Sequence, residues 1–248
     1  MKVLVTGAGR GLGYELVREG VRRGHEVIAA YRTDTPELMR LMEDWGGQIL
    51  PVKMDVSFEE DVRDAAEKVG KTAGALNGIV NNAGVLFGSK YSTADPITEA
   101  DLSEYQKTFD VNLMGPVRVL KYFMPLVYET KGCRTVLNIT SEGAALRSTG
   151  YHYVSYASSK AALNSYTQRI RNYLKGRDDK KDIRIAMIHP GRMKTDMGVE
   201  NGEILPEVTA VSLWDMLEGQ IAIDNEIPFY DYMGNWMPQI NMGGKEKM

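Results

Sequence analysis

The sequence predicts an α/β fold built on a doubly wound parallel sheet with helices on both faces. Short apolar runs rich in β-branched residues alternate with amphipathic helical stretches along most of the chain. A glycine-rich turn over residues 7–13 directly follows the first apolar run. Both features are typical of a Rossmann-type sheet, here of about seven strands, whose ligands bind at the carboxyl ends of the strands.

The elements follow one another in βαβ order. A strand over 2–6 leads through the glycine turn into a helix over about 12–23, which Gly24 ends, and a continuous apolar strand over 25–31 completes the first unit. Apolar periodicity then predicts helices over 36–45, 58–71, 104–130, 155–174 and 208–220, and strands over 48–54, 78–81, 135–139, 184–188 and 227–232. Gly115 and Pro116 should bend the long helix over 104–130.

Composition narrows the class of protein. The 248 residues are 43% hydrophobic and 25% charged, which predicts one domain over residues 1–248. The net charge of -3 argues against nucleic acid as the main partner. The single cysteine, Cys133, has no internal disulfide partner, and the spacings typical of zinc ligands are absent, so we expect no metal. The sequence has no apolar run of the roughly 18 residues that a membrane span needs, so we expect a cytoplasmic protein without a membrane partner.

The glycine turn is the first candidate binding site. Gly7, Gly11 and Gly13 let the backbone approach a pyrophosphate closely, and the helix behind them offers unpaired N–H groups to an anion. The alternative is a tight strand-to-helix turn with no ligand. Its place between a predicted strand and a predicted helix favours a dinucleotide site.

Two arginines indicate which dinucleotide binds. Enzymes that select NAD commonly carry an acidic residue at the end of the second strand, whereas a cation there suits a 2′-phosphate. Here that strand ends in Tyr31 and Arg32, and Arg10 lies inside the glycine turn. Either arginine alone is equally well explained as a solvated surface residue. Together they predict NADP(H).

Tyr156 and Lys160 lie four residues apart on a predicted helix and therefore share one face. A nearby ammonium would stabilise the phenolate and lower the pKa of Tyr156, which suits an acid–base catalyst. Ser141, just beyond the strand over 135–139, would hydrogen-bond the substrate oxygen. A core tyrosine with a solvated lysine is the alternative for the pair taken alone.

These motifs together resemble the short-chain dehydrogenase/reductase family, of the common type of about this length. The match is carried by the glycine turn, Asp55-Val56, Asn81-Asn-Ala-Gly84, Asn112 in Asp-Val-Asn-Leu, Ser141, Tyr156-Ala-Ser-Ser-Lys160 and Pro190-Gly-Arg-Met-Lys-Thr195. The ending over 229–238 is more loosely similar to the carbonyl reductases typified by C-factor and sniffer proteins. Ser141 lies fifteen positions before Tyr156, farther than is common in the family.

The resemblance implies a role for each matched residue. The implied catalytic residues are Asn112, Ser141, Tyr156 and Lys160, with Asn112 holding a water that links Lys160 to solvent. The implied cofactor-binding residues are Gly7, Gly9, Arg10, Gly11, Leu12, Gly13, Arg32, Asp55, Val56, Asn82, Ala83, Gly84, Tyr156, Lys160, Pro190, Gly191, Met193 and Thr195. Taken singly, Asp55 is also explained as a helix cap, and Asn82 as a partner of turn amides.

The predicted function is an NADP(H)-dependent oxidoreductase that transfers hydride between nicotinamide and a carbonyl or alcohol of a small molecule. Residues near the catalytic positions in sequence favour an apolar or aromatic substrate, although they would equally pack only within the protein: Leu86, Phe87, Leu146, Tyr151 and Tyr153. A non-catalytic NADP(H)-binding sensor is the first alternative, and an isomerase or dehydratase the second. Relatives commonly pair through the two helices that carry Asn112 and Tyr156, so a homodimer or homotetramer is expected.

Overall fold

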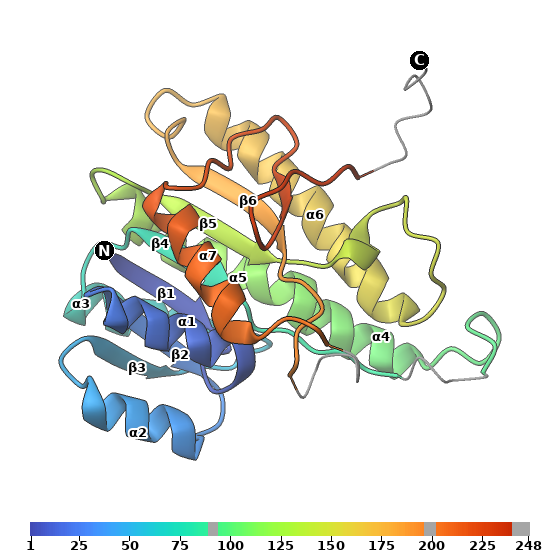
Figure 1. Ribbon diagram of the computed structural model, residues 1–248, viewed down its shortest axis with the longest axis horizontal. Helices are drawn as coiled ribbons and strands as arrows, with labels where there is room; N and C mark the ends of the chain where they lie inside the picture. The colour runs from blue at the N-terminus through green and yellow to red at the C-terminus, as the bar shows by residue number, and fades with distance from the viewer. Residues whose placement is uncertain (89–93, 196–201, 240–248) are drawn as a thin grey trace.

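One parallel sheet organises the computed structural model, which describes residues 1–88, 94–195 and 202–239 (Figure 1). Within these residues, seven strands lie in the order β3-β2-β1-β4-β5-β6-β7, and every pairing between them is parallel. The strands are β1 (Lys2–Thr6), β2 (Glu26–Tyr31), β3 (Ile49–Lys53), β4 (Gly78–Asn81), β5 (Thr135–Ile139), β6 (Arg184–His189) and β7 (Phe229–Asp231). The predicted fold class is confirmed.

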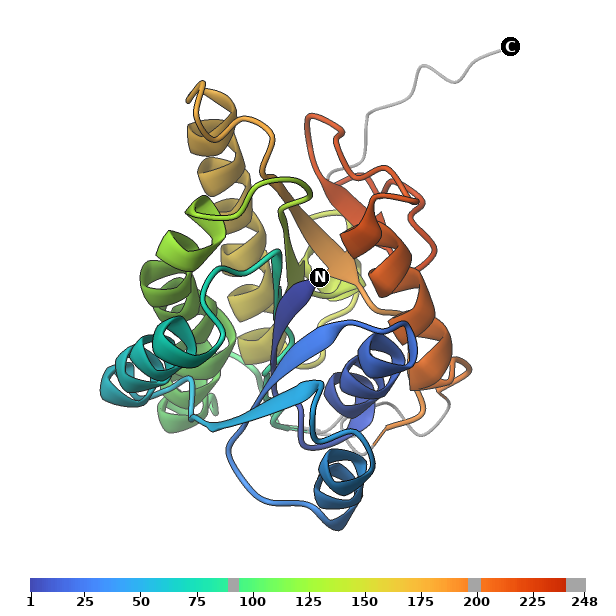
Figure 2. The same ribbon diagram turned by 90° about the vertical axis from the view of Figure 1, so that its left-hand side faces the viewer.

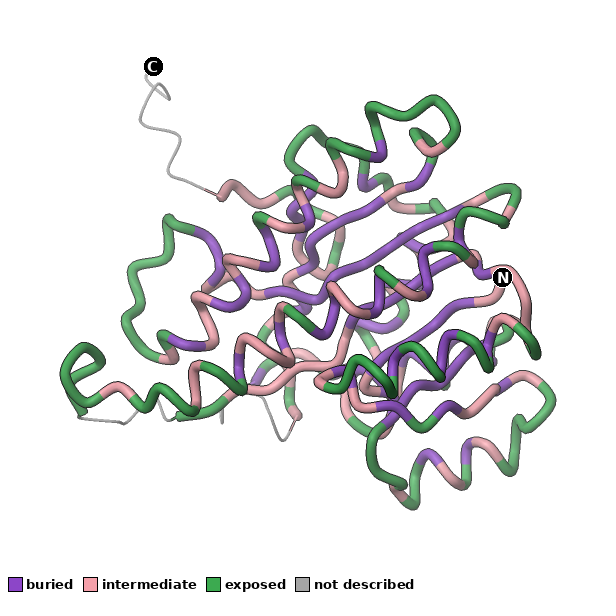
Figure 3. Tube along the Cα trace, turned by 180° about the vertical axis from the view of Figure 1, so that it is seen from behind, coloured by how far each residue is buried: buried purple, intermediate pink, exposed green. Residues whose placement is uncertain are grey.

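Helices cover both faces of this sheet, as the view along its edge shows (Figure 2). One face carries α1 (Gly11–Arg22), α2 (Pro36–Asp44) and α7 (Pro206–Glu218), and the other carries α3 (Glu59–Thr72), α5 (Gly115–Tyr128) and α6 (Val154–Lys175). The strands between them are almost wholly buried (Figure 3). Because apolar side chains from both faces of each strand are removed from water, the sheet forms the centre of two apolar cores.

Packing on the first face depends on one large side chain. Trp214 of α7 is fully buried and donates its indole N–H to the carbonyl of Leu16 at 2.9 Å. Gly20 on α1 leaves room for that ring, since a Cβ there would lie 2.3 Å from a Trp214 ring atom. The pair holds α1, and with it the glycine turn, firmly against α7.

The predicted long helix over 104–130 is divided, and the division is not the simple bend expected at Gly115 and Pro116. Instead α4 (Leu102–Phe109) passes into a π-helical segment, η1 (Asp110–Met114), and then into α5. Proline has no N–H to bond the carbonyl four residues earlier, so Pro116 favours a wider turn before it. Gly115 brings this turn close to the sheet side, where a Cβ would lie 2.9 Å from Val56 Cγ2.

The carboxyl ends of the strands meet at one edge, and the loops that follow them surround a common space. In the described part of the chain, no helix is both long and apolar enough to cross a bilayer. Predicted site residues follow each strand from β1 to β6, so the parallel topology gathers them at this edge.

Candidate active site

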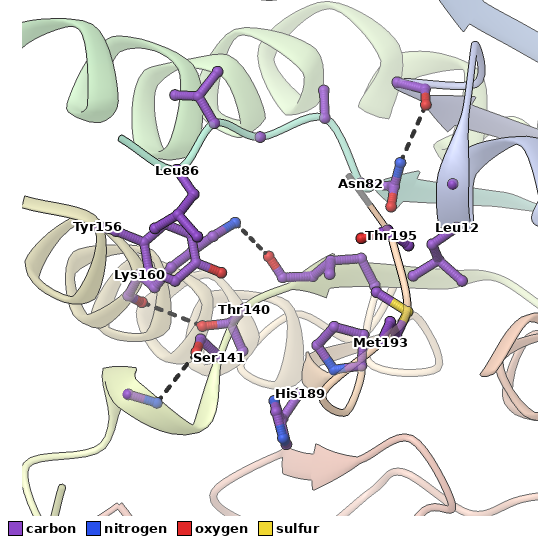
Figure 4. A pocket seen from close by; sticks show the side chains of 18 of the residues that line it. Leu12, Asn82, Leu86, Thr140, Ser141, Tyr156, Lys160, His189, Met193 and Thr195 are labelled. Carbon is purple, nitrogen blue, oxygen red and sulfur yellow. Dashed lines mark hydrogen bonds between the residues drawn. The ribbon is translucent and has the colours of Figure 1, made fainter. Parts of the chain in front are cut away.

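A pocket of about 1500 Å³ occupies the carboxyl edge of the sheet (Figure 4). Most of the predicted site residues line it: Gly7, Gly9, Arg10, Gly11, Leu12, Arg32, Asp55, Val56, Asn82, Ala83, Gly84, Ser141, Tyr156, Lys160, Pro190, Gly191, Met193 and Thr195. Gly13 and Asn112 do not line it. The sequence therefore identified one contiguous surface, and two of its predicted residues lie just behind that surface.

The glycine turn has the conformation expected of a phosphate cradle. Gly7 and Gly11 adopt φ values of 68° and 54°, which other residues rarely adopt. A Cβ on Gly13 would lie 2.1 Å from the carbonyl oxygen of Gly7, so only glycine lets α1 begin so close to β1. Gly13 therefore serves close packing of helix and strand, and the surface open to a ligand is left to Gly7, Gly9 and Gly11.

Asn82 fixes this turn to the end of β4. Its Nδ2 donates to the carbonyl of Thr6 at 2.9 Å and approaches that of Gly7 at 3.4 Å. The Thr6 hydroxyl in turn accepts the backbone N–H groups of Asn82 and Ala83, each at 3.0 Å. Asn82 thus does satisfy turn groups, as the simpler interpretation held, and by doing so it rigidifies the floor of the pocket.

Arg32 and Asp55 face each other at the far end of the pocket. One guanidinium nitrogen of Arg32 lies 3.6 Å from Asp55 Oδ2, and the arginine side chain is 70% exposed. Asp55 Oδ1 accepts the backbone N–H and the hydroxyl of Ser57, so Asp55 forms a local turn and does not cap α3, whose N-cap is Phe58. These hydrogen bonds and Arg32 outweigh burial and lower the pKa of Asp55.

Thr35 is a residue at this end that sequence reasoning missed. Its hydroxyl donates to the carbonyl of Gly9 at 2.6 Å and also caps α2, which ties the loop after β2 to the glycine turn. The nearby carboxylate of Asp34 is held by Lys53 at 2.8 Å, and Asp34 does not line the pocket. A threonine preceding Pro36 at a helix start was the available signal.

Asn112 is fully buried in the π-helical segment. Its Oδ1 accepts the N–H of Val85 at 2.8 Å, and its Nδ2 donates to the Val85 carbonyl at 2.9 Å and to the Ser159 hydroxyl at 3.1 Å. The side chain thus joins the segment after β4 to α6. The water-holding role implied by the family resemblance stays a prediction.

Tyr156 and Lys160 lie on one face of α6, beside Ser141 at the end of β5 (Figure 4). Lys160 Nζ donates to the carbonyl of Ile139 at 2.8 Å and lies 5.8 Å from the centre of the Tyr156 ring. Ser141 Oγ accepts the N–H of Gly143 at 3.2 Å, which begins the short helix η2 (Glu142–Ala144). Ser141 lines the pocket together with Tyr156 and Lys160, despite its unusually long spacing to Tyr156.

The predicted lowering of the Tyr156 pKa by Lys160 is wrong. Burial raises the pKa of Tyr156, and hydrogen bonding by Ser141 only opposes that rise. Burial also lowers the pKa of Lys160 to about 8, because its ammonium has lost its water. At neutral pH the phenol is therefore protonated and the lysine still mostly charged.

The segment after β6 closes the pocket over the glycine turn. Gly191 has a φ of 84°, and the Pro190 carbonyl accepts the Thr209 hydroxyl at 3.0 Å. A Cβ on Gly11 would lie 3.5 Å from Thr195 Cγ2, so Thr195 reaches the glycine turn. The two predicted cofactor segments, far apart in sequence, thus face each other across the pocket.

The substrate side of the pocket differs from the expected apolar wall. Leu86, Phe87 and Tyr153 line it, but Leu146 and Tyr151 do not and are 82% and 71% exposed. Polar residues that the sequence analysis missed take much of that wall: Glu142, Arg147, Ser148, Thr149, His152, His189 and Arg192. The position of His189 directly before Pro190-Gly191 was the signal available for one of them.

Comparison with known proteins assigns the chain to a family. A family model described as short chain dehydrogenase matches residues 1–204. The chain belongs to the short-chain dehydrogenase family. Proteins of this family are oxidoreductases that use a nicotinamide cofactor on small-molecule substrates.

Individual relatives of this short-chain dehydrogenase are distant. An uncharacterized oxidoreductase of Schizosaccharomyces pombe is 32% identical over 197 residues, which are 79% of this chain and 72% of that protein. L-xylulose reductase of Caenorhabditis elegans is 31% identical over 202 residues, 81% of this chain and 74% of that protein. A short chain dehydrogenase of Aspergillus terreus is 34% identical, but the match covers 79% of this chain and only 41% of that protein.

Solved structures agree on the fold of this short-chain dehydrogenase. The carbonyl reductase Sniffer of D. melanogaster superposes with a TM-score of 0.84 at 22% identity, covering 96% of this chain and 98% of that chain. NADPH-bound carbonyl reductase from chicken fatty liver gives 0.82, also at 22% identity and with the same coverage. At such identity the likeness establishes the fold alone.

Proposed function

We propose that the protein is an NADP(H)-dependent carbonyl reductase that interconverts a carbonyl and an alcohol of a small molecule, with Tyr156 as acid and base. One observation carries the proposal: Tyr156, Ser141 and Lys160 line the same pocket as the glycine turn and Arg32. A dinucleotide in the cradle would thereby lie beside an acid–base group.

The residues present fit such a cofactor. The turn at Gly7 and Gly11 offers the start of α1 to a pyrophosphate, and Gly84 lines the same pocket next to Lys160. Arg32 is exposed and only loosely paired with Asp55, so it is free to turn to a 2′-phosphate. Bound NADP(H) would supply or accept the hydride.

The side chains supply the rest of the chemistry. The raised pKa of Tyr156 keeps its phenol protonated, which is the form that gives a proton to a carbonyl oxygen as that oxygen becomes an alcohol. The Ser141 hydroxyl binds the same oxygen, and its hydrogen bond opposes the burial that raises the pKa of Tyr156. Lys160, which is also a predicted cofactor-binding residue, lies 5.8 Å from the centre of the Tyr156 ring and would hold the cofactor beside it.

The names of relatives support this reaction class. L-xylulose reductase of Caenorhabditis elegans and estradiol 17-beta-dehydrogenase 2 of Rattus norvegicus, the latter 30% identical, are named for carbonyl or alcohol substrates. The NADPH and NADP in two structural neighbours support the choice of cofactor. A homodimer or homotetramer, a cytoplasmic location and a single domain over 1–248 stay predictions.

The test is a titration followed by turnover. NADPH and NADH affinities are measured by fluorescence, and loss of NADPH absorbance is then followed with a panel of aldehydes, ketones and quinones. We expect tighter binding of NADPH and turnover of part of the panel. Tighter binding of NADH would overturn the cofactor assignment, and binding without any turnover would favour an NADP(H)-binding sensor.

A further inference from the structure

His189 is a half-buried polar residue of the pocket that the proposed reaction does not use. It is the last residue of β6 and lies below Ser141 in the pocket wall (Figure 4). Its Nδ1 accepts the backbone N–H of Glu142 at 3.2 Å. Because Glu142 directly follows Ser141, this hydrogen bond holds the imidazole beside the serine that binds the reacting oxygen.

The charge state of the ring decides what it offers to a ligand. Burial lowers the pKa of His189, Glu142 of η2 and Asp231 of β7 raise it, and Arg192 lowers it further. Burial is the largest of these influences, so the ring is neutral at neutral pH. A neutral imidazole that accepts at Nδ1 carries its proton on Nε2.

That second nitrogen has no hydrogen-bond partner among residues 1–88, 94–195 and 202–239, and it is not sealed from solvent. Other polar residues line the same pocket, among them Ser148, Thr149 and His152. An N–H group here, next to the site of the reacting oxygen, suits a ligand oxygen better than an apolar group.

We propose that the substrate carries a second oxygen on the carbon next to its reacting carbonyl, and that His189 Nε2–H donates a hydrogen bond to this oxygen. The substrate class is then the α-hydroxyketones and 1,2-dicarbonyls. The proposal rests on the proposed carbonyl reductase activity, in which Tyr156 and Ser141 hold the first oxygen. His189 would select among carbonyl compounds, while the backbone of Glu142 keeps its ring in place.

Two substitutions separate the two nitrogens. Asparagine at this position places its Oδ1 near the place of Nδ1 and lacks a group at Nε2, whereas glutamine reaches the place of Nε2 with a donor and gives up the bond to Glu142. The probes are 1-hydroxy-1-phenylpropan-2-one and 1-phenylpropan-2-one, which share the reacting ketone and differ by one hydroxyl.

We expect His189→Asn to lower kcat/KM for the hydroxyketone about five- to tenfold, mainly through KM, and to change that for the plain ketone less than about twofold. His189→Gln, the matched control, should keep the preference for the hydroxyketone while kcat falls for both probes, because Glu142 loses its acceptor. This variant also carries the test if His189→Asn does not fold.

Equal losses on both probes in His189→Asn would show a merely structural residue and overturn the proposal, as would no loss on either probe. Loss of the preference in a folded His189→Gln would overturn it as well. Failure of the proposed function looks different, since the wild-type protein would then bind NADPH and turn over neither probe nor any other member of the carbonyl panel.

Discussion

The cofactor side and the substrate side of the pocket are built in different ways. On the cofactor side, close contacts with the backbone dominate. A Cβ on Gly13 would lie 2.1 Å from the Gly7 carbonyl oxygen, and the Asn82 side chain donates to the Thr6 carbonyl at 2.9 Å. On the substrate side, exposed side chains such as Arg147 form the wall, and Arg192 pairs with Glu142 at 2.8 Å near the surface. We expect backbone shape to hold the cofactor that the family shares, and exchangeable side chains to meet the substrate that varies.

The largest effect is expected where the two sides meet. Tyr156→Phe removes the proton donor and keeps the ring that lines the pocket. Turnover should fall about 10³-fold, within the usual range for a general acid, while NADPH affinity stays within about twofold. Steady-state kinetics and fluorescence titration of the same preparation measure both. Undiminished turnover would remove Tyr156 from the chemistry and leave the pocket without its proposed acid.

A pair of alanine substitutions tests the contrast in backbone packing. Gly13→Ala should lower the free energy of unfolding by about 3 kcal/mol or more, because its Cβ meets the Gly7 carbonyl at 2.1 Å. Gly143→Ala, on the substrate side, should change it by less than about 1 kcal/mol, since its Cβ would meet nothing nearer than Ser141 Oγ at 3.6 Å. Denaturant unfolding compares the two, and similar losses would erase the distinction.

Lys160→Met tests how much the buried charge of Lys160 lowers the free energy of unfolding. Burial lowers the pKa of Lys160 from 10.5 to about 8, so the folded wild-type protein is destabilised below about pH 8 and gains stability as the pH rises toward 10.5. The variant should lack this pH dependence of the free energy of unfolding. At neutral pH it should be up to about 3 kcal/mol more stable than wild type, minus the cost of leaving the Ile139 carbonyl without its hydrogen-bond donor. Turnover should be lost. A variant less stable than wild type at neutral pH would contradict the burial argument.

The smallest effect concerns the exposed end of the cofactor side. Arg32→Ala should weaken NADPH about tenfold and NADH less than twofold, because only NADPH offers a 2′-phosphate to the guanidinium. The arginine is 70% exposed, so the effect should shrink in high salt. Titration of both cofactors at two salt concentrations measures this, and equal losses would mean that Arg32 does not read the phosphate.

The same contrast explains what the sequence predicted. Local geometry determines the roles of the glycines at 7, 11 and 13 and of the apolar strands, so the sequence pattern reveals them. Strands β1, β4 and β5 were predicted with the bounds that the structure has. The polar wall around His189 and Arg147 arises from segments that meet only in three dimensions. Likewise the raised pKa of Tyr156 depends on burial by the whole fold, which spacing to Lys160 does not reveal.

Asn112 lies between these cases. The family resemblance implied a catalytic role for it, but the π-helical turn around it was not predicted, because one wide turn leaves almost no trace in apolar periodicity. The structure shows what the residue holds: Val85 on one side and Ser159 on the other.

That wide turn changes the phase of the helical rod that it interrupts. In an α-helix each residue advances the side-chain direction by about 100°, so one extra residue in η1 rotates α4 relative to α5 by about that angle. The continuous helix formed by α4, η1 and α5 can then pack α4 against α6 with one face and α5 against α3 with a different face. One extra residue thus lets the combined helix pack against two neighbours with two different faces. A one-residue deletion in η1 would rotate these faces back into line, so the packing against either α6 or α3 would be lost.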